Sequence, residues 1–331
     1  MTGSDTSQGC DATDPRQIPA RGWWEVAKRV AEQLSSDHVP VVAAGVAFFS
    51  FLAIFPAIAG FVILYGLVAD PATVGAQLAP IRGLIPAEVF DLLATQLQKV
   101  SGAEDRRLGF GLLFSLAFAV WSSAKGSTAL LSAMDIAYSE PHRTGWVWPR
   151  VMALLFTLAG LVFAALAIGL LAAVPAAVAL LAVEDPLSTL LLGLRWVLLA
   201  GAVLVALGAL YRYGPNRRSA RLAWVTPGSI LATAVWLLAS WGFGRYVANF
   251  GSYNETFGAL GTVVILLMWL YISAYIICLG AELNAELELH TAADTTVGRW
   301  RPKGSRDAYV ADHSPAEDDD RRKQGEDDGR R

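Results

Sequence analysis

The sequence is poor in the residues from which disulfide bonds and zinc sites are built. Its 331 residues include two cysteines and four histidines. Cys10 lies in a polar amino-terminal arm and Cys278 in an apolar run, and no histidine stands near either of them. The sequence therefore implies no disulfide framework and offers a poor zinc site.

Catalytic motifs are also absent from the sequence. The histidines form no HExxH pair, and no GxSxG segment presents a serine nucleophile. The segments "GSDTSQGC" and "WSSAKGST" lack the spacing of a phosphate-binding loop, so ATP-driven work is not expected. A ribonuclease would need carboxylate metal ligands or a basic, aromatic groove in a soluble domain. We therefore expect no enzyme activity, no catalytic or cofactor-binding residue, no bound metal and no nucleic-acid partner.

Charge is scarce in the middle of the chain, where long apolar runs take its place. Hydrophobic residues make up 54% of the sequence and charged residues 17%, and the mean hydropathy is +0.44. A hydrocarbon core about 30 Å thick requires roughly 20 apolar residues in each helix. The sequence thus predicts an all-α, polytopic membrane helix bundle with six transmembrane helices. The six runs are 41–69, 108–137, 151–183, 187–212, 223–248 and 257–281.

The distribution of Lys and Arg predicts the orientation of these helices. Basic residues precede the first run and lie between the second and third and between the fourth and fifth, whereas loops 184–186 and 249–256 contain none. Short loops rich in Lys and Arg stay in the cytoplasm. The segment 70–107 is an exception, because it carries basic residues yet must lie outside. Both termini are therefore expected in the cytoplasm.

The flanking segments complete the predicted domain organisation. Residues 1–21 and 290–331 are polar, so we expect a disordered amino-terminal arm and a disordered, charged cytoplasmic tail. Between them lies the membrane domain 22–289. Apolar residues at helical spacing predict an amphipathic helix over 22–36, either on the membrane surface or packed on the bundle, and an outer amphipathic helix over about 86–100.

Four segments of the membrane domain resemble a known family. They read "VAAGVAFFSFLAIFPAIAGFVILYGLV", "FAVWSSAKGSTALLSAMDIAY", "LYRYGPNRRSARLAWVTPGSILATAVWLLASWGFGRYV" and "YNETFGALGTVVILLMWLYISAYIICLGAELNAELE". In these segments the chain is similar to the YihY/BrkB family, over about residues 22–288. The resemblance implies a six-helix protein of the bacterial cytoplasmic (inner) membrane without an established chemical activity. Some members have been linked to transport of lipid A precursors, and a ribonuclease label is widely regarded as a misassignment.

Ionisable side chains at membrane depth are candidate substrate contacts, because a charge in hydrocarbon costs about 2.5 kcal/mol or more and usually faces a partner or a wet cavity. With a rise of about 1.5 Å per residue, Arg195 lies about 12 Å below the outer surface. It either anchors a phosphate or carboxylate of a lipid head group or extends outward to Glu184 or Asp185. Arg245 is expected at the outer interface.

Two polar patches accompany these arginines. Lys125, with Ser122 and Ser123, lies near the cytoplasmic boundary of the second run, where it either lines a vestibule or extends into solvent. The outer turn around Asn254 and Glu255 precedes the sixth run, where backbone donors either receive an anion or form an ordinary cap.

The stretch "CLGAELNAELE" at 278–288 adds carboxylates to the end of the sixth run. Glu282 lies about 37 Å along the helix from Phe257, at the cytoplasmic boundary, so a proton relay in mid-membrane is not expected. Glutamates at a helix carboxyl end oppose the helix dipole, so cationic partners are expected. The candidate ion-pair residues are Glu282, Glu286, Arg217, Arg218 and Arg221, with Lys125 as a further cation.

Prolines and glycines within the runs predict kinks and close helix packing. Broken helices also occur in transporters, although packing explains the same residues. The residues are Pro56 and Pro175 for kinks, and Gly45, Gly228, Gly258, Gly261 and Gly280 for packing.

Two kinds of function are consistent with these features. The first is a transporter or translocase, without ATPase activity, of a lipid or amphipathic anion, with a pathway lined by Arg195, Lys125 and residues near Glu282. The second is a non-catalytic membrane scaffold or envelope assembly factor, whose tail and surface helix recruit partners. Membrane lipids are the expected partners, and a homo-oligomer is compatible with the sequence.

The predicted topology has a direct test. A reporter that is active only in the periplasm is expected to be inactive when fused at residue 290, because the chain there lies in the cytoplasm. Strong reporter activity would contradict the six-span arrangement.

Overall fold

The computed structural model describes residues 12–68, 106–141, 147–181, 185–248, 259–318 and 320–321. In these ranges the chain is helical apart from turns and one isolated β-bridge between Ala220 and Thr296. The predicted all-α fold is therefore confirmed. The outer helix expected over about 86–100 lies outside the described residues, as do Asn254, Glu255 and Gly258.

Long helices form the bundle, and five stretches of them are long and apolar enough to cross a membrane: Val39–Pro56, Trp148–Leu171, Leu187–Tyr213, Leu222–Val247 and Val263–Leu289. The six spans remain a prediction. The helices are α2 (Val39–Val68), α5 (Arg106–Ala137), α6 (Trp148–Ile168), α7 (Val174–Leu180), α8 (Leu187–Tyr213), α9 (Leu222–Ala248) and α11 (Ala259–Leu289).

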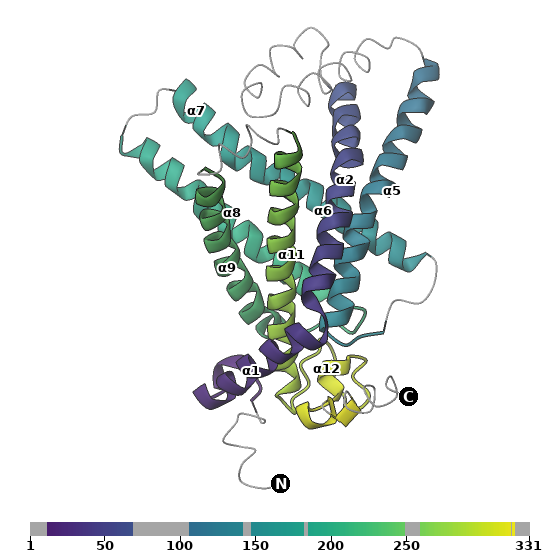
Figure 1. The fold of residues 1–331 in the computed structure, drawn as a ribbon, viewed down its shortest axis with the longest axis vertical. Helices are drawn as coiled ribbons and strands as arrows, with labels where there is room; N and C mark the ends of the chain where they lie inside the picture. Colours follow the sequence, from purple (N-terminus) through teal and green to yellow (C-terminus); the bar gives the residue numbers. More distant parts are fainter. Residues whose placement is uncertain are drawn as a thin grey trace.

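Helix α11 lies in the middle of this bundle. It packs against α9, α2 and α5, while α2 packs along α5, α5 along α6, and α8 along α9. Helix α1 (Ala20–Ser36) and the short α12 (Tyr309–Asp312) lie together at one end of the bundle, which we call the terminal end. The helices converge there, whereas α5 and α8 diverge toward the opposite end (Figure 1).

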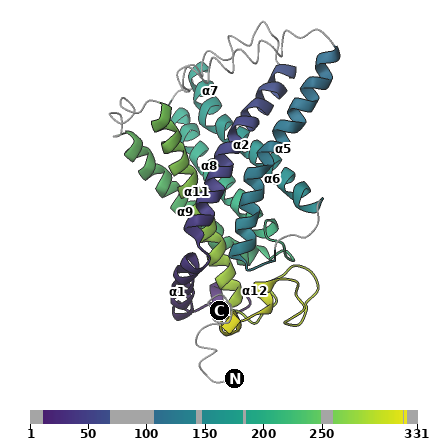
Figure 2. The same cartoon turned by 45° about the vertical axis from the view of Figure 1, so that its right-hand side comes forward.

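Helix α1 packs against the last turns of α11 and does not lie apart from the bundle. Its Val26 and Val30 are buried in one apolar cluster with Trp224, Leu283 and Leu287. In two views of the molecule, the end of α11 lies between α1 and the segment that carries α12 (Figures 1 and 2). Of the two placements open to the amphipathic helix, the structure has the packed one.

Close packing of α9 on α11 depends on two of the predicted glycines. A Cβ atom at Gly228 would lie 2.1 Å from the carbonyl oxygen of Gly280. A Cβ atom at Gly280 would lie 2.4 Å from the Tyr211 hydroxyl and 2.8 Å from the carbonyl oxygen of Gly228. No larger residue fits either position without a shift of the backbone.

The other small-residue predictions have mixed outcomes. Gly261 is buried, as close packing requires. The packing role expected for Gly45 is wrong, because a Cβ atom there would meet nothing within 4 Å. A role that was not predicted belongs to Gly126 of α5, where a Cβ atom would lie 3.2 Å from the Ser50 Cα atom of α2.

The predicted interruption at Pro175 coincides with a change of helix type. Helix α6 continues into the π-helical segment η4 (Gly169–Ala173), and α7 begins one residue before Pro175. Proline has no N–H, and its ring clashes with the carbonyl four residues earlier, so wider π turns accommodate the break. Helix α2, in contrast, continues through Pro56.

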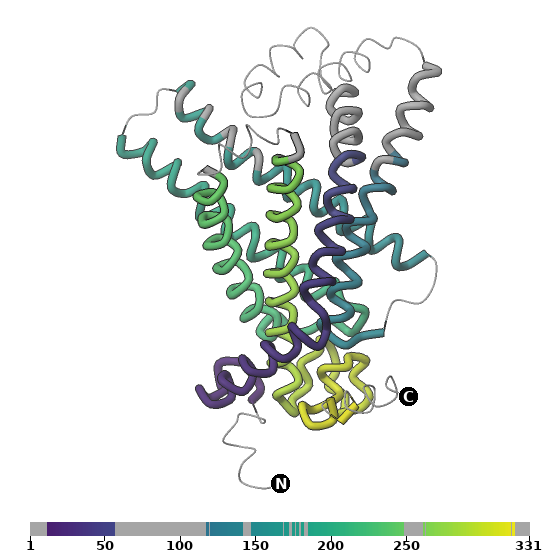
Figure 3. The backbone as a smooth tube through the Cα atoms, viewed as in Figure 1, coloured from purple at the N-terminus to yellow at the C-terminus, as the bar shows by residue number. Residues whose placement is uncertain are grey.

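The terminal end carries a folded segment, residues 290–318, which we call the cap (yellow in Figure 3). The disorder predicted for the tail is wrong for residues 290–318. Hydrogen bonds rather than an apolar core hold the cap together: buried Arg306 donates from Nη1 to the carbonyls of Ala293 (2.9 Å) and Ala311 (2.7 Å), and from Nη2 to that of Ala292 (2.9 Å). The prediction of disorder rested on the low content of large apolar residues, and that content gives no information about a fold held by hydrogen bonds.

The predicted amino-terminal arm is also partly ordered. Residues 15–17 form the short helix η2 (Pro15–Gln17), and Ala12 and Ile18 are buried in the cluster that joins α1 to α11. This apolar contact accounts for the order, and residues 1–11 lie outside the described part of the chain.

The glycine crossing generates a stability prediction. The substitution Gly228→Ala is expected to lower the free energy of unfolding by about 3 kcal/mol, because its methyl group overlaps the α11 backbone. The matched change Gly45→Ala is expected to be neutral or stabilising by up to about 1 kcal/mol, since alanine favours helix and the space is open. Thermal unfolding of the detergent-solubilised proteins measures both changes, and equal midpoints for the two variants would contradict the packing.

Candidate functional site

The last turns of α11 carry four polar side chains that are almost completely buried. Glu282 and Glu286 are each 1% exposed, and Asn284 and Glu288 are 0% exposed. Residues four apart share a helix face, so the pair at 282 and 286 and the pair at 284 and 288 point to different sides of α11. Buried polar groups require hydrogen-bond partners, and different elements of the fold supply them.

Helix α1 supplies the partner of Glu286. The Nε atom of Arg29 donates to Glu286 Oε2 at 2.7 Å, and its Nη2 lies 3.5 Å from Asp318 Oδ2 of the cap. The side chain of Arg29 is 15% exposed, and that of Glu286 is 1% exposed. One arginine therefore joins α1, α11 and the cap.

The turn between α8 and α9 supplies the partner of Glu288. Arg217 donates to both carboxylate oxygens, from Nη2 at 2.6 Å and from Nη1 at 3.2 Å, and both side chains are 0% exposed. Thr295 of the cap donates its hydroxyl to the same carboxylate at 2.6 Å, and the guanidinium carbon lies 4.5 Å from the Tyr138 ring centroid. Burial is the largest single influence on the pKa of Arg217 and lowers it. The charge of Glu288, its hydrogen bonds and the nearby Tyr138 and Glu140 together outweigh burial, so the pKa is raised.

Asn284 binds the backbone of α9 where that helix is interrupted. Pro227 within α9 has no N–H to continue the ladder of hydrogen bonds. The Gly228 N–H donates to Asn284 Oδ1 at 2.8 Å, and Asn284 Nδ2 donates to the Val225 carbonyl at 3.2 Å. Sequence reasoning missed this role, and the signal for it is an asparagine in an apolar helix opposite a Pro-Gly pair.

The structure brings only part of the predicted ion-pair set together. Arg217 binds a carboxylate of α11, as expected for this arginine, but the carboxylate is that of Glu288. Arg218 and Arg221 donate instead to main-chain carbonyls of the cap, those of Arg299 at 2.9 Å and Thr296 at 3.1 Å. The further candidate, Lys125, is exposed on α5.

The turn after α5 binds the cap through a second carboxylate. Glu140 Oε1 accepts the Tyr309 N–H at 2.7 Å. Burial raises the pKa of Glu140 from 4.5 to about 7; the Tyr309 N–H and the charge of Arg217 oppose this rise, and Asp135 and Glu288 add to it. This carboxyl therefore titrates near neutral pH.

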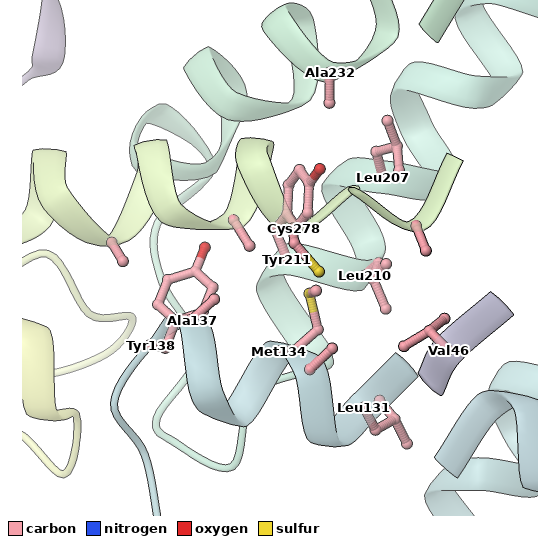
Figure 4. Close-up of a cluster of buried hydrophobic side chains, with 14 of the residues drawn as sticks. Val46, Leu131, Met134, Ala137, Tyr138, Leu207, Leu210, Tyr211, Ala232 and Cys278 are labelled. Carbon is pink, nitrogen blue, oxygen red and sulfur yellow. The ribbon is translucent and has the colours of Figure 1, made fainter. Parts of the chain in front are cut away.

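An apolar cavity lies among the long helices, on the side of these charges away from the terminal end. Its volume is about 330 Å³, and α5, α6, α8, α9 and α11 form its walls. Leu207 and Leu210 of α8 point into the same buried cluster as Cys278 of α11 (Figure 4). The lining residues are Leu130, Phe156, Ala159, Gly160, Phe163, Val203, Ala206, Leu207, Ala209, Leu210, Trp236, Ile276 and Ile277.

Arg195 lies on α8 on the same helix face as the cavity wall, because Arg195, Leu199 and Val203 follow each other at intervals of four residues. Its Nε atom is buried and makes no hydrogen bond within the described part of the chain. Its guanidinium carbon lies 5.4 Å from the Trp196 ring centroid.

The remaining predicted contacts lie elsewhere. Ser123 is buried in α5 and Ser122 is half-buried beside it, whereas Arg245 is exposed on α9. Arg195, Lys125 and Glu282 belong to three helices, α8, α5 and α11. Within the described ranges, no three His, Cys, Asp or Glu side chains gather in a way that could hold a metal ion.

Comparison with known proteins gives a family match over most of the chain. The family described as virulence factor BrkB matches residues 30–304. A Bacillus subtilis (strain 168) protein named as ribonuclease-like, YfkH, is 28% identical over 250 residues, which are 74% of this chain and 88% of the relative. No solved structure matches the chain.

Shorter matches link the chain to proteins named as UPF0761 membrane proteins. One from Alteromonas mediterranea is 45% identical over 89 residues, 27% of this chain and 30% of the relative. Another from Alkalilimnicola ehrlichii is 40% identical over 122 residues, 35% of this chain and 26% of the relative. The chain therefore covers less than a third of each of these two relatives.

The raised pKa of Glu140 predicts a pH dependence of stability. A carboxyl group whose folded-state pKa lies above its unfolded value binds its proton more tightly in the folded protein, so stability falls as pH rises from about 4.5 to about 7. Glu140→Gln keeps an oxygen acceptor for the Tyr309 N–H but does not titrate. The loss of thermal stability between about pH 5 and about pH 8 is therefore expected to be smaller in the variant. Equal losses in the two proteins would contradict this role of Glu140.

Proposed function

The chain belongs to the BrkB family of membrane proteins, and from that premise we propose that it is a transporter or translocase of a lipid or another amphipathic anion. It works without ATPase activity in the bacterial inner membrane, with both termini in the cytoplasm. One observation carries the proposal, namely an apolar cavity that shares a helix face with a half-buried arginine whose Nε atom makes no hydrogen bond among the described residues.

The cavity fits the apolar part of such a substrate. Its volume of about 330 Å³ falls at the lower end of the range of roughly 300–1,000 Å³ that is usual for ligand pockets. Its walls are apolar side chains, which favour an apolar occupant. Among membrane helices, the apolar groups at hand are hydrocarbon chains.

Arg195 fits the anionic part of the substrate. It lies about 12 Å from Val203 along α8, on the side away from the terminal end. A guanidinium group binds phosphate or carboxylate through two parallel hydrogen bonds, and the buried Nε of Arg195 makes no hydrogen bond among the described residues. A molecule that places a hydrocarbon chain in the cavity and a negatively charged head group on Arg195 is an amphipathic anion.

A second candidate function, the membrane scaffold, is favoured by a different observation. Trp300 of the cap and Trp24 of α1 are 70% and 63% exposed at the terminal end. Exposed aromatic side chains are enriched at protein interfaces. A scaffold would lose its partners on Trp300→Ala, whereas transport would continue.

Reconstitution in liposomes tests the transport proposal. Purified protein is expected to move a fluorescent anionic lipid between leaflets, and Arg195→Ala is expected to slow this movement about tenfold because the head group loses a charged hydrogen-bond donor. Arg21→Ala, at an exposed arginine of α1 outside the proposed pathway, serves as the control and is expected to retain the rate. A failure to move any anionic lipid, or equal rates for the two variants, would contradict the proposal.

The same assay tests the cavity. A Cβ atom at Gly160 or at Gly201 would meet nothing within 4 Å, but only Gly160 lines the cavity. Gly160→Leu is therefore expected to fill the cavity and block transport in a folded protein, while Gly201→Leu on α8 leaves transport unchanged. Transport by Gly160→Leu at the wild-type rate would exclude this cavity as the route.

A further inference from the structure

The terminal end is closed by two successive layers along α11. The inner layer consists of Met134, Tyr211 and Cys278, which are at most 1% exposed and lie close together in Figure 4. Tyr211 donates its hydroxyl to the carbonyl of Ile277, a residue that lines the cavity. Along α11, Cys278 of the inner layer follows Ile277 of the cavity wall and precedes the buried carboxylates.

The outer layer consists of the two ion pairs Arg29–Glu286 and Arg217–Glu288, which we call the clasp. Glu286 and Glu288 lie two and nearly three helical turns beyond Cys278 along α11. Their arginines come from α1 and from the turn between α8 and α9, and the cap adds Asp318 and Thr295. The clasp thus holds three separate parts of the chain to the helix that also lines the cavity.

Charged partners suit a contact that opens. Removing two charges from water is costly, and well-packed apolar residues often stabilise a fold as well as a buried ion pair does. An ion pair that separates regains the hydration of both charges, whereas separated apolar residues gain nothing from water. The clasp can therefore exchange between a closed and an open arrangement at a modest difference in free energy.

We propose that the clasp is the gate of the transport pathway at the terminal end. When the two ion pairs separate, α11 moves away from α1 and from the turn between α8 and α9, the inner layer parts, and water reaches Cys278 and the cavity. This inference rests on the proposed function, because the gate controls access to the same cavity.

Cys278 reports on the gate independently of transport. In a Cys10→Ser background it is the single thiol of the chain, and it is 1% exposed. A membrane-impermeant maleimide added from the side of the termini is expected to label it slowly. Glu288→Gln weakens the clasp and is expected to raise the labelling rate about tenfold. The matched control is Glu317→Gln, which breaks the exposed 2.9 Å pair with Lys303 in the cap and leaves the rate unchanged.

A second pair of variants separates a gate from a purely structural contact. Glu286→Gln weakens the other ion pair, that with the partly exposed Arg29, and is expected to raise the labelling rate of Cys278. This variant keeps the test available if Glu288→Gln does not fold. The double variant Arg217→Met with Glu288→Leu keeps the site filled without charge. It is expected to fold, to label no faster than the wild type and to lose transport, because its apolar pair resists opening to water.

The outcomes for the gate and for transport can be told apart. Wild-type labelling rates in folded Glu288→Gln and Glu286→Gln, or wild-type transport by the double apolar variant, would overturn the gate. If Cys278 labelling responds as expected but no anionic lipid moves in liposomes, the clasp still opens, and it is the proposed transport of an anionic lipid that fails.

Discussion

The structure depends on the burial of a polar helix end. Four polar side chains in the last turns of α11 are withdrawn from water, and each face of the helix needs its own partner. Helix α1 brings Arg29, the turn between α8 and α9 brings Arg217, and the backbone of α9 receives Asn284. The opposing helix dipole makes the arginines more necessary, because carboxylates at a helix carboxyl end are disfavoured unless cations compensate them.

The terminal end is compact, and the opposite end is wider (Figure 1). Helices α9 and α11 come closest at Gly228 and Gly280, because these residues have no side chain to keep the two backbones apart. Beyond that crossing, toward the end away from α1 and the cap, α8 and α5 diverge (Figure 1). The apolar cavity lies among the helices on that side of the clasp.

The parts of the fold that follow from local pattern could be predicted from the sequence. Length and hydropathy identify five of the predicted runs, which coincide with described helices that are long and apolar enough to cross a membrane. The run 108–137 coincides with α5, which is not one of these five among the described residues. The position of Glu282 along its helix placed the charged stretch at one end of the bundle and called for arginine partners, and Arg217 is one of those named. Which carboxylate it binds could not be predicted, because Glu282, Glu286 and Glu288 differ only in direction around the helix axis.

The sequence by itself determined the helical class, the apolar runs and the need for cations near the end of α11, because each follows from composition or from spacing along one helix. The tertiary structure alone decided the pairings of Arg29 with Glu286 and of Arg217 with Glu288. It also decided the hydrogen bonds of Asn284 to the α9 backbone and the order of residues 290–318. These contacts join residues up to 257 positions apart, as Arg29 and Glu286 do. Their partners are selected by which helix faces meet in space, and no local pattern in the sequence encodes that selection.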